Sequence, residues 1–168
     1  MFGSEDDRRQ LEKIIADVLR IPRDQDKLRA DVLAMRAEMA AHKPPRGAFD
    51  AKLLRGGLVD LEFLVHFLQL RDGVGLHPDL GAACQALAGA GALSPAIREA
   101  YDLMTRMLVA GRLFAPDGGY PPEASRELVA RAAGCADWQT LLGRFAQARA
   151  IVGSEWRRVF ASELETDQ

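Results

Sequence analysis

This chain of 168 residues has few of the side chains that usually build catalytic or metal sites. It has two cysteines and three histidines, its aromatic fraction is 7%, and it contains no G-x-S-x-G, G-x-x-x-x-G-K-[ST] or G-x-G-x-x-G motif. The one pair at metal-ligand spacing, Glu62 with His66, is typical of a hydrogen bond on a helix surface. We therefore predict no metal site and no complete catalytic set in these residues.

The sequence also lacks long apolar runs and a large excess of positive or negative charge. No stretch approaches 18 apolar residues and the N-terminus is charged, so we predict neither a membrane span nor a signal peptide. The net charge is -2 and there is no basic arm, which argues against a nucleic-acid partner. Cys84 and Cys135 lack metal-ligand spacing and lie in alanine-rich surroundings, so we expect reduced core thiols and a cytoplasmic protein.

The sequence does contain helical periodicity, interrupted at prolines and glycines. No alternating five-residue pattern bounded by turns indicates a strand. Capping residues and prolines instead divide the chain into helical segments, expected over about residues 4–20, 24–43 (with Asp24 or Asp26 at the start), 58–71, 79–90, 95–115, 121–133 and from 137 onward. The prediction is an all-α, irregular helical bundle of about seven helices with no sheet. We expect a single helical domain over 1–168, with an N-terminal helical pair in 1–45 and the main bundle in 46–168.

The chain is organised around the stretch from Phe49 to Arg71, where a charged turn leads directly into a very apolar helix. Few polar residues occur in that helix, so it is predicted to be mostly buried. Gly56 and Gly57 are adjacent in the turn, and they allow it a positive φ or the close approach of another backbone.

Charged residues gather on both sides of these glycines: Asp50, Lys52 and Arg55 before them, and Asp60 and Glu62 in the first turn of the helix. Carboxylates at a helix start are ordinary, so the simplest interpretation is a set of caps and ion pairs. The alternative is a mixed-charge cluster beside free backbone N–H groups, where a phosphate or a partner loop docks. The spacing alone does not decide between these interpretations.

The segment D-A-K-L-L-R-G-G-L-V-D-L-E-F, preceded by K-P-P-R-G, resembles the signature of bacterial glutamine synthetase adenylyltransferase. That bifunctional enzyme attaches AMP to glutamine synthetase and removes it, and the uridylyltransferase of the PII protein is similar. The family pattern resembles D-x-K-x-G-x-G-G-x-x-D-x-E-F. It is matched here by Asp50, Lys52, Gly56, Gly57, Asp60, Glu62 and Phe63, and Leu54 departs from it where the family often has glycine or another small residue.

The resemblance implies that the chain is the C-terminal helical domain of a larger enzyme, whose catalytic aspartates lie in a nucleotidyltransferase core outside these residues. It also implies a set of residues that face this core or its nucleotide: Asp50, Lys52, Arg55, Gly56, Gly57, Asp60 and Glu62. If they face outward, replacing Lys52 or Asp60 is expected to change the stability of the isolated domain little.

The same resemblance implies an activity for the parent enzyme, namely transfer of AMP from ATP, with magnesium, to a tyrosine of glutamine synthetase, with PII as a further partner. The isolated chain is predicted to be inactive, with no catalytic residue and no cofactor of its own. The alternative function is a stand-alone helical protein-interaction module without catalytic activity. A reading frame with a nucleotidyltransferase core upstream favours the first function, and a frame that ends near Met1 favours the second.

Overall fold

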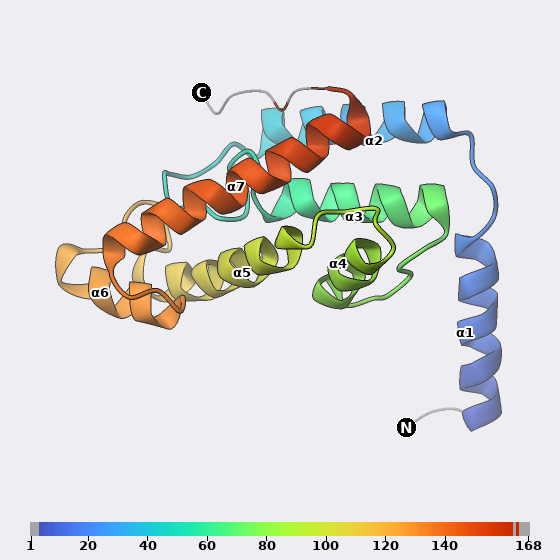
Figure 1. The fold of residues 1–168 in the computed structure, drawn as a ribbon, viewed down its shortest axis with the longest axis horizontal. Helices are drawn as coiled ribbons and strands as arrows, with labels where there is room; N and C mark the ends of the chain where they lie inside the picture. The colour runs from blue at the N-terminus through green and yellow to red at the C-terminus, as the bar shows by residue number, and fades with distance from the viewer. Residues whose placement is uncertain (1–3, 163, 165–168) are drawn as a thin grey trace.

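The structure is a computed structural model that describes residues 4–162 and 164, and these residues form seven helices and no strand (Figure 1). This confirms the predicted all-α bundle. The helices are α1 (Glu5–Leu19), α2 (Gln25–His42), α3 (Leu58–Asp72), α4 (Leu80–Gly89), α5 (Ala96–Phe114), α6 (Glu123–Ala132) and α7 (Trp138–Phe160).

Polar caps begin four of these helices at positions that the sequence indicated. Ser4, Asp24, Asp79 and Asp137 each accept a hydrogen bond from the backbone N–H of the third residue after them. Such a bond satisfies one of the N–H groups that a helix leaves unpaired at its start. Local sequence therefore sets these helix starts.

Helix α3 runs through the centre of the bundle and contacts α2, α4, α5 and α7 (Figure 1). Leu61, Leu64, Val65 and Leu68 share one face of the helix and have no exposed surface, and Val59 and Phe67, on other sides of it, are also buried. A helix that is apolar on several sides needs neighbours all round it. The prediction that this helix is buried is confirmed.

The longest helices, α5 and α7, form the most extensive helix pair, and α6 packs against both of them. Aromatic rings join distant parts of this core: Phe67 of α3 lies 4.7 Å from Phe160 of α7, centroid to centroid, and Phe49 lies 5.3 Å from Trp138. Phe49 thereby attaches the loop before α3 to the start of α7.

Helix α1 stands apart from this bundle at one end (Figure 1). None of its residues is buried, whereas α2 packs along α3. The grouping of residues 1–45 as a helical pair stays a prediction. What the structure shows is α2 joined to the bundle and α1 projecting from it.

Both cysteines are free and buried, as the sequence predicted. Burial raises the pKa of the Cys84 thiol to about 11. Among the helices described here, none has the length and hydrophobicity required to cross a bilayer.

Candidate functional site

The turn before α3 is built on Gly56. Its φ is 76°, in the left-handed region, and its backbone N–H donates to Asp60 Oδ2 at 2.6 Å. A Cβ at this position would lie 2.4 Å from the carbonyl oxygen of Arg149 in α7. The backbone conformation and the close approach of α7 both require glycine here.

Gly57 is a glycine for a different reason. It is the N-cap of α3 with an ordinary φ of -83°, but a Cβ would lie 2.6 Å from the carbonyl oxygen of Leu54 and 2.8 Å from that of Ala51. The sequence left open a positive φ or the close approach of another backbone at this glycine pair. Gly56 shows both, and Gly57 shows only the close approach. Both glycines are buried, and they shape the turn from inside the domain.

Asp60 anchors this turn from inside the domain. Its side chain has no exposed surface, and it pairs with Arg36 Nε of α2, whose side chain is 4% exposed. The same carboxylate accepts the Gly56 N–H, so one buried anion joins α2, α3 and the turn. This corrects the prediction that Asp60 faces a core domain or its nucleotide. The simpler interpretation, a structural ion pair, describes Asp60.

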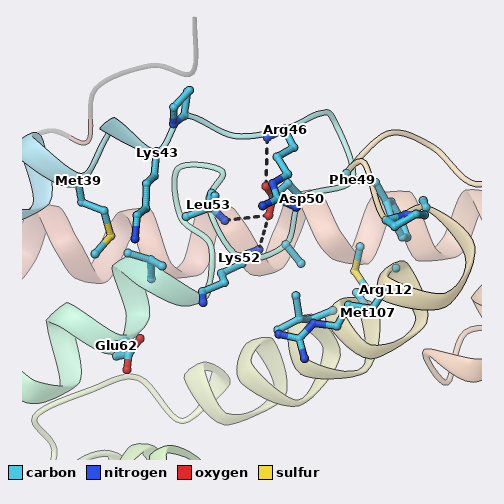
Figure 2. Close-up of a pocket in the computed structure, with 18 of the residues that line it drawn as sticks. Met39, Lys43, Arg46, Phe49, Asp50, Lys52, Leu53, Glu62, Met107 and Arg112 are labelled. Carbon is cyan, nitrogen blue, oxygen red and sulfur yellow. Dashed lines mark hydrogen bonds between the residues drawn. The ribbon is translucent and has the colours of Figure 1, made fainter. Parts of the chain in front are cut away.

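Asp50 holds the first half of the turn. Its Oδ1 accepts the backbone N–H groups of Lys52 and Leu53 at 3.1 Å each, and its Oδ2 accepts that of Arg46 at 3.1 Å (Figure 2). Farther along, the carbonyl of Arg55 accepts a hydrogen bond from Arg149 Nε at 2.7 Å. Asp50 therefore positions the backbone from which Arg46 and Lys52 extend, and Arg55 attaches the turn to α7.

A pocket of about 670 Å³ lies beside the turn, between the C-terminal end of α2, the start of α3 and the C-terminal end of α5 (Figure 2). Its buried lining is apolar and includes Phe49, Val59 and Met107. Its exposed lining carries four cations, Lys43, Arg46, Lys52 and Arg112, together with the carboxylate of Glu62, and the half-buried Asp50 also lines it. Lys43, Lys52 and Arg112 extend toward the same space (Figure 2).

The charges of this pocket are not balanced. Across residues 4–162 and 164, the side chains of its four cations form no ion pair, and the Asp50 carboxylate is occupied by backbone N–H groups. Glu62 is exposed, and its Oε1 lies 3.9 Å from His66 Nε2. The pocket therefore carries an excess of positive charge over an apolar base, which suits an anionic group with a less polar part.

No three or more His, Cys, Asp or Glu side chains among the described residues are placed to hold a metal ion. The four cations of the pocket can attract and orient an anion.

Of the residues predicted from the sequence, Asp50, Lys52 and Glu62 lie together at the pocket. Lys43, Arg46 and Arg112 also line it and were not predicted. The K-P-P-R segment next to the signature was a usable signal for Lys43 and Arg46. Arg112 lies on α5, and no local pattern relates it to the turn.

The similar proteins all carry the same name. A bifunctional glutamine synthetase adenylyltransferase/adenylyl-removing enzyme from Caulobacter vibrioides is 36% identical over 168 residues, a match that covers 94% of this chain and 17% of the relative. Proteins of the same description from Brucella suis (38% over 133 residues, 73% of this chain, 13% of the relative) and Bordetella bronchiseptica (39% over 152 residues, 83% and 16%) also match. The chain is homologous to one segment of these adenylyltransferases.

The homology confirms the resemblance that the signature indicated, and it extends beyond the signature to most of the chain. The chain spans only 13–17% of the length of these adenylyltransferases, so the match concerns a segment of them. No protein-family model matches the chain.

Proposed function

We propose that this chain is a helical domain of a glutamine synthetase adenylyltransferase, at the C-terminal side of its catalytic core. In this proposal the core transfers AMP from ATP, with magnesium, to a tyrosine of glutamine synthetase in the cytoplasm, and PII is a further partner. The observation that carries the proposal is the homology over 94% of this chain to a segment that makes up 17% of the Caulobacter relative. The chemistry is assigned to the core because nucleotidyl transfer depends on metal ions held by positioned carboxylates.

The basic pocket is the part of this domain that faces the core in our proposal. Lys52 comes from the signature itself, and Lys43, Arg46 and Arg112 complete a positive lining without carboxylate partners among the described residues. Such a lining stabilises the phosphates of a nucleotide, or the Asp and Glu side chains of a loop, presented by the core. Positive charge fixed beside a developing negative charge lowers the barrier to its formation.

The test is adenylylation of glutamine synthetase by the complete polypeptide with Lys52→Ala and Arg112→Ala combined. We expect the rate to fall by about 10- to 100-fold, because the variant lacks two preorganised positive charges. Lys27→Ala is the matched control, since Lys27 is an exposed lysine of α2 that does not line the pocket. An unchanged rate in the double variant, with the fold intact, would contradict a role for the pocket in transfer.

A second test uses the 168-residue chain alone, which we expect neither to adenylylate glutamine synthetase nor to bind ATP–magnesium tightly. Its acidic residues near the turn do not converge, since Asp60 is buried against Arg36 while Glu62 is exposed two residues along the same helix. Side chains two residues apart on a helix point about 200° from each other. Micromolar affinity in calorimetry, or any turnover, would show that the turn itself is catalytic.

The second candidate function, a stand-alone protein-interaction module, is favoured by one observation. Helix α1 exposes a row of large apolar side chains that is suited to a protein partner. The complete reading frame distinguishes the two candidates, because a nucleotidyltransferase core encoded in the same frame supports the first.

A further inference from the structure

We propose that the exposed apolar face of α1 packs against another domain of the same polypeptide and so fixes the helical bundle relative to it. The α1 stripe is defined here as Leu11, Ile14, Ile15 and Val18 with the adjoining Ile21. This inference rests on the proposed function in one respect, namely that a further domain belongs to the same polypeptide.

The residues of the stripe adjoin one another, and each remains about half exposed to solvent in this domain. Leu11, Ile14, Ile15 and Val18 follow the spacing i, i+3, i+4 and i+7, which places them on one face of the helix. Ile21 lies just beyond the helix, and each of the five residues is 49–57% exposed. No residue of α1 is buried. The helix stands apart from the rest of the bundle (Figure 1). Single exposed leucines are common on protein surfaces, whereas a contiguous apolar row usually marks an interaction site.

Hydrogen bonds stabilise both ends of α1. Ser4 and Asp7 form a capping box at its start, and the Arg23 guanidinium donates to the carbonyls of Leu19 and Ile21 at 2.9 Å each. Arg23 belongs to the short connection to α2, so this contact orients α1 relative to the bundle. A helix of 15 residues is still marginal in water without tertiary packing. Covering the stripe would supply that packing.

The charges of α1 select the kind of partner. Residues 5–19 contain five carboxylates and three cations, and several of them pair within the helix, with Arg8 Nη2 2.6 Å from Glu5 Oε1. Helices that lie on membranes are rich in Lys and Arg on their polar face, and nucleic-acid surfaces require an excess of positive charge. The net negative charge of α1 matches neither, so the partner is an apolar protein surface.

The area of the stripe distinguishes a tethered domain from a second copy of this chain. Five half-exposed aliphatic side chains offer on the order of 400 Å² at most. Specific complexes between separate proteins bury about 800 Å² from each partner. The stripe is too small for a stable dimer by itself. A domain in the same polypeptide needs less area, because the tether provides an effective concentration of roughly millimolar.

The Caulobacter relative is much longer than the segment that matches this chain. The match to the Caulobacter relative covers 94% of this chain, so about ten residues lie outside it. Because the stripe begins at Leu11, it falls within the match even if all of these residues are at the N-terminus. This chain corresponds to 17% of that relative, so most of the relative's length lies outside the matched segment and is available to cover α1.

Hydrogen exchange tests the proposal, with the amides of α1 followed in the 168-residue chain and in the complete polypeptide that contains it. We expect exchange in α1 to be at least about tenfold slower in the complete polypeptide. Ile15→Lys, at the centre of the stripe, should restore fast exchange, because a lysine there cannot be buried without a partner. The matched control, Glu12→Lys, places the same side chain outside the stripe and should leave exchange slow. Neither variant should disturb the bundle, since α1 has no buried residue.

Equally fast exchange of α1 in both proteins would overturn the proposal, and so would a dimer of the isolated chain that Ile15→Lys dissociates. The readout does not depend on AMP transfer. If α1 stays unprotected while the Lys52 and Arg112 double variant loses activity, only the docking inference fails. If the pocket variant retains activity while α1 is protected, only the role of the pocket fails.

Discussion

The Arg36 guanidinium of α2 and the Asp60 carboxylate of α3 form an ion pair that is almost entirely removed from solvent. The same carboxylate accepts the backbone N–H of Gly56 at 2.6 Å. One side chain thus joins two helices to the turn that carries the signature. The two residues are 24 positions apart in the sequence, and their contact determines where the glycine turn sits relative to α2.

Asp60→Ala should therefore destabilise the isolated chain by about 3–5 kcal/mol, because it leaves the Arg36 charge buried without its partner. Urea denaturation measures this free energy of unfolding. Asp31→Ala is the control, since Asp31 pairs with Lys27 on the surface of α2 and exposed pairs contribute about 0–1 kcal/mol. Equal costs for the two variants would show that the buried pair is not structural.

Gly56→Ala should lower stability by more than Gly91→Ala does. Both glycines have a positive φ, 76° and 73°, so both substitutions impose similar backbone strain of about 1–3 kcal/mol. A Cβ at Gly56 would also meet the Arg149 carbonyl oxygen at 2.4 Å, whereas a Cβ at Gly91 has nothing within 4 Å. Thermal unfolding of both variants gives the difference. Similar melting temperatures would mean that α7 moves away without cost.

Lys52→Ala should leave stability within about 0.5 kcal/mol of the parent chain, because its exposed side chain forms no ion pair with any of the described residues. The same experiment on Asp60→Ala should give a large loss, so the two signature residues separate into a surface group and a structural group. A large loss for Lys52→Ala would indicate that its side chain supports the fold, which would weaken its assignment to the pocket surface.

The Cys84 thiol should react with iodoacetamide far more slowly in the folded chain than in urea. The thiolate is the reactive form, and a pKa raised to about 11 leaves little of it at pH 8. Between the ordinary thiol pKa and this raised value the unfolded chain has lost a proton that the folded chain retains, so stability contributed by Cys84 falls as pH rises through that window. Mass spectrometry locates the label, and fast native labelling of Cys84 at pH 8 would contradict its burial.

The sequence by itself determined the helices and their starts. Ser4, Asp24, Asp79 and Asp137 cap helices through bonds to residues three positions away, so the necessary information is local. The apolar composition of α3 similarly indicated its burial, because such a helix has no face that water can solvate well. The signature also predicted the relationship to glutamine synthetase adenylyltransferases, since a signature is a pattern of nearby residues in the sequence.

Only the tertiary structure decided what the signature residues do. Asp60 and Glu62 are two residues apart, yet one is buried against Arg36 and the other is exposed beside the pocket, because only Asp60 points toward α2. Position 56 requires glycine partly because the backbone of α7 at Arg149 leaves no room for a Cβ, and Arg112 reaches the pocket from α5. These contacts join residues dozens of positions apart. Their partners are set by how the helices pack, and no local period in the sequence records that packing.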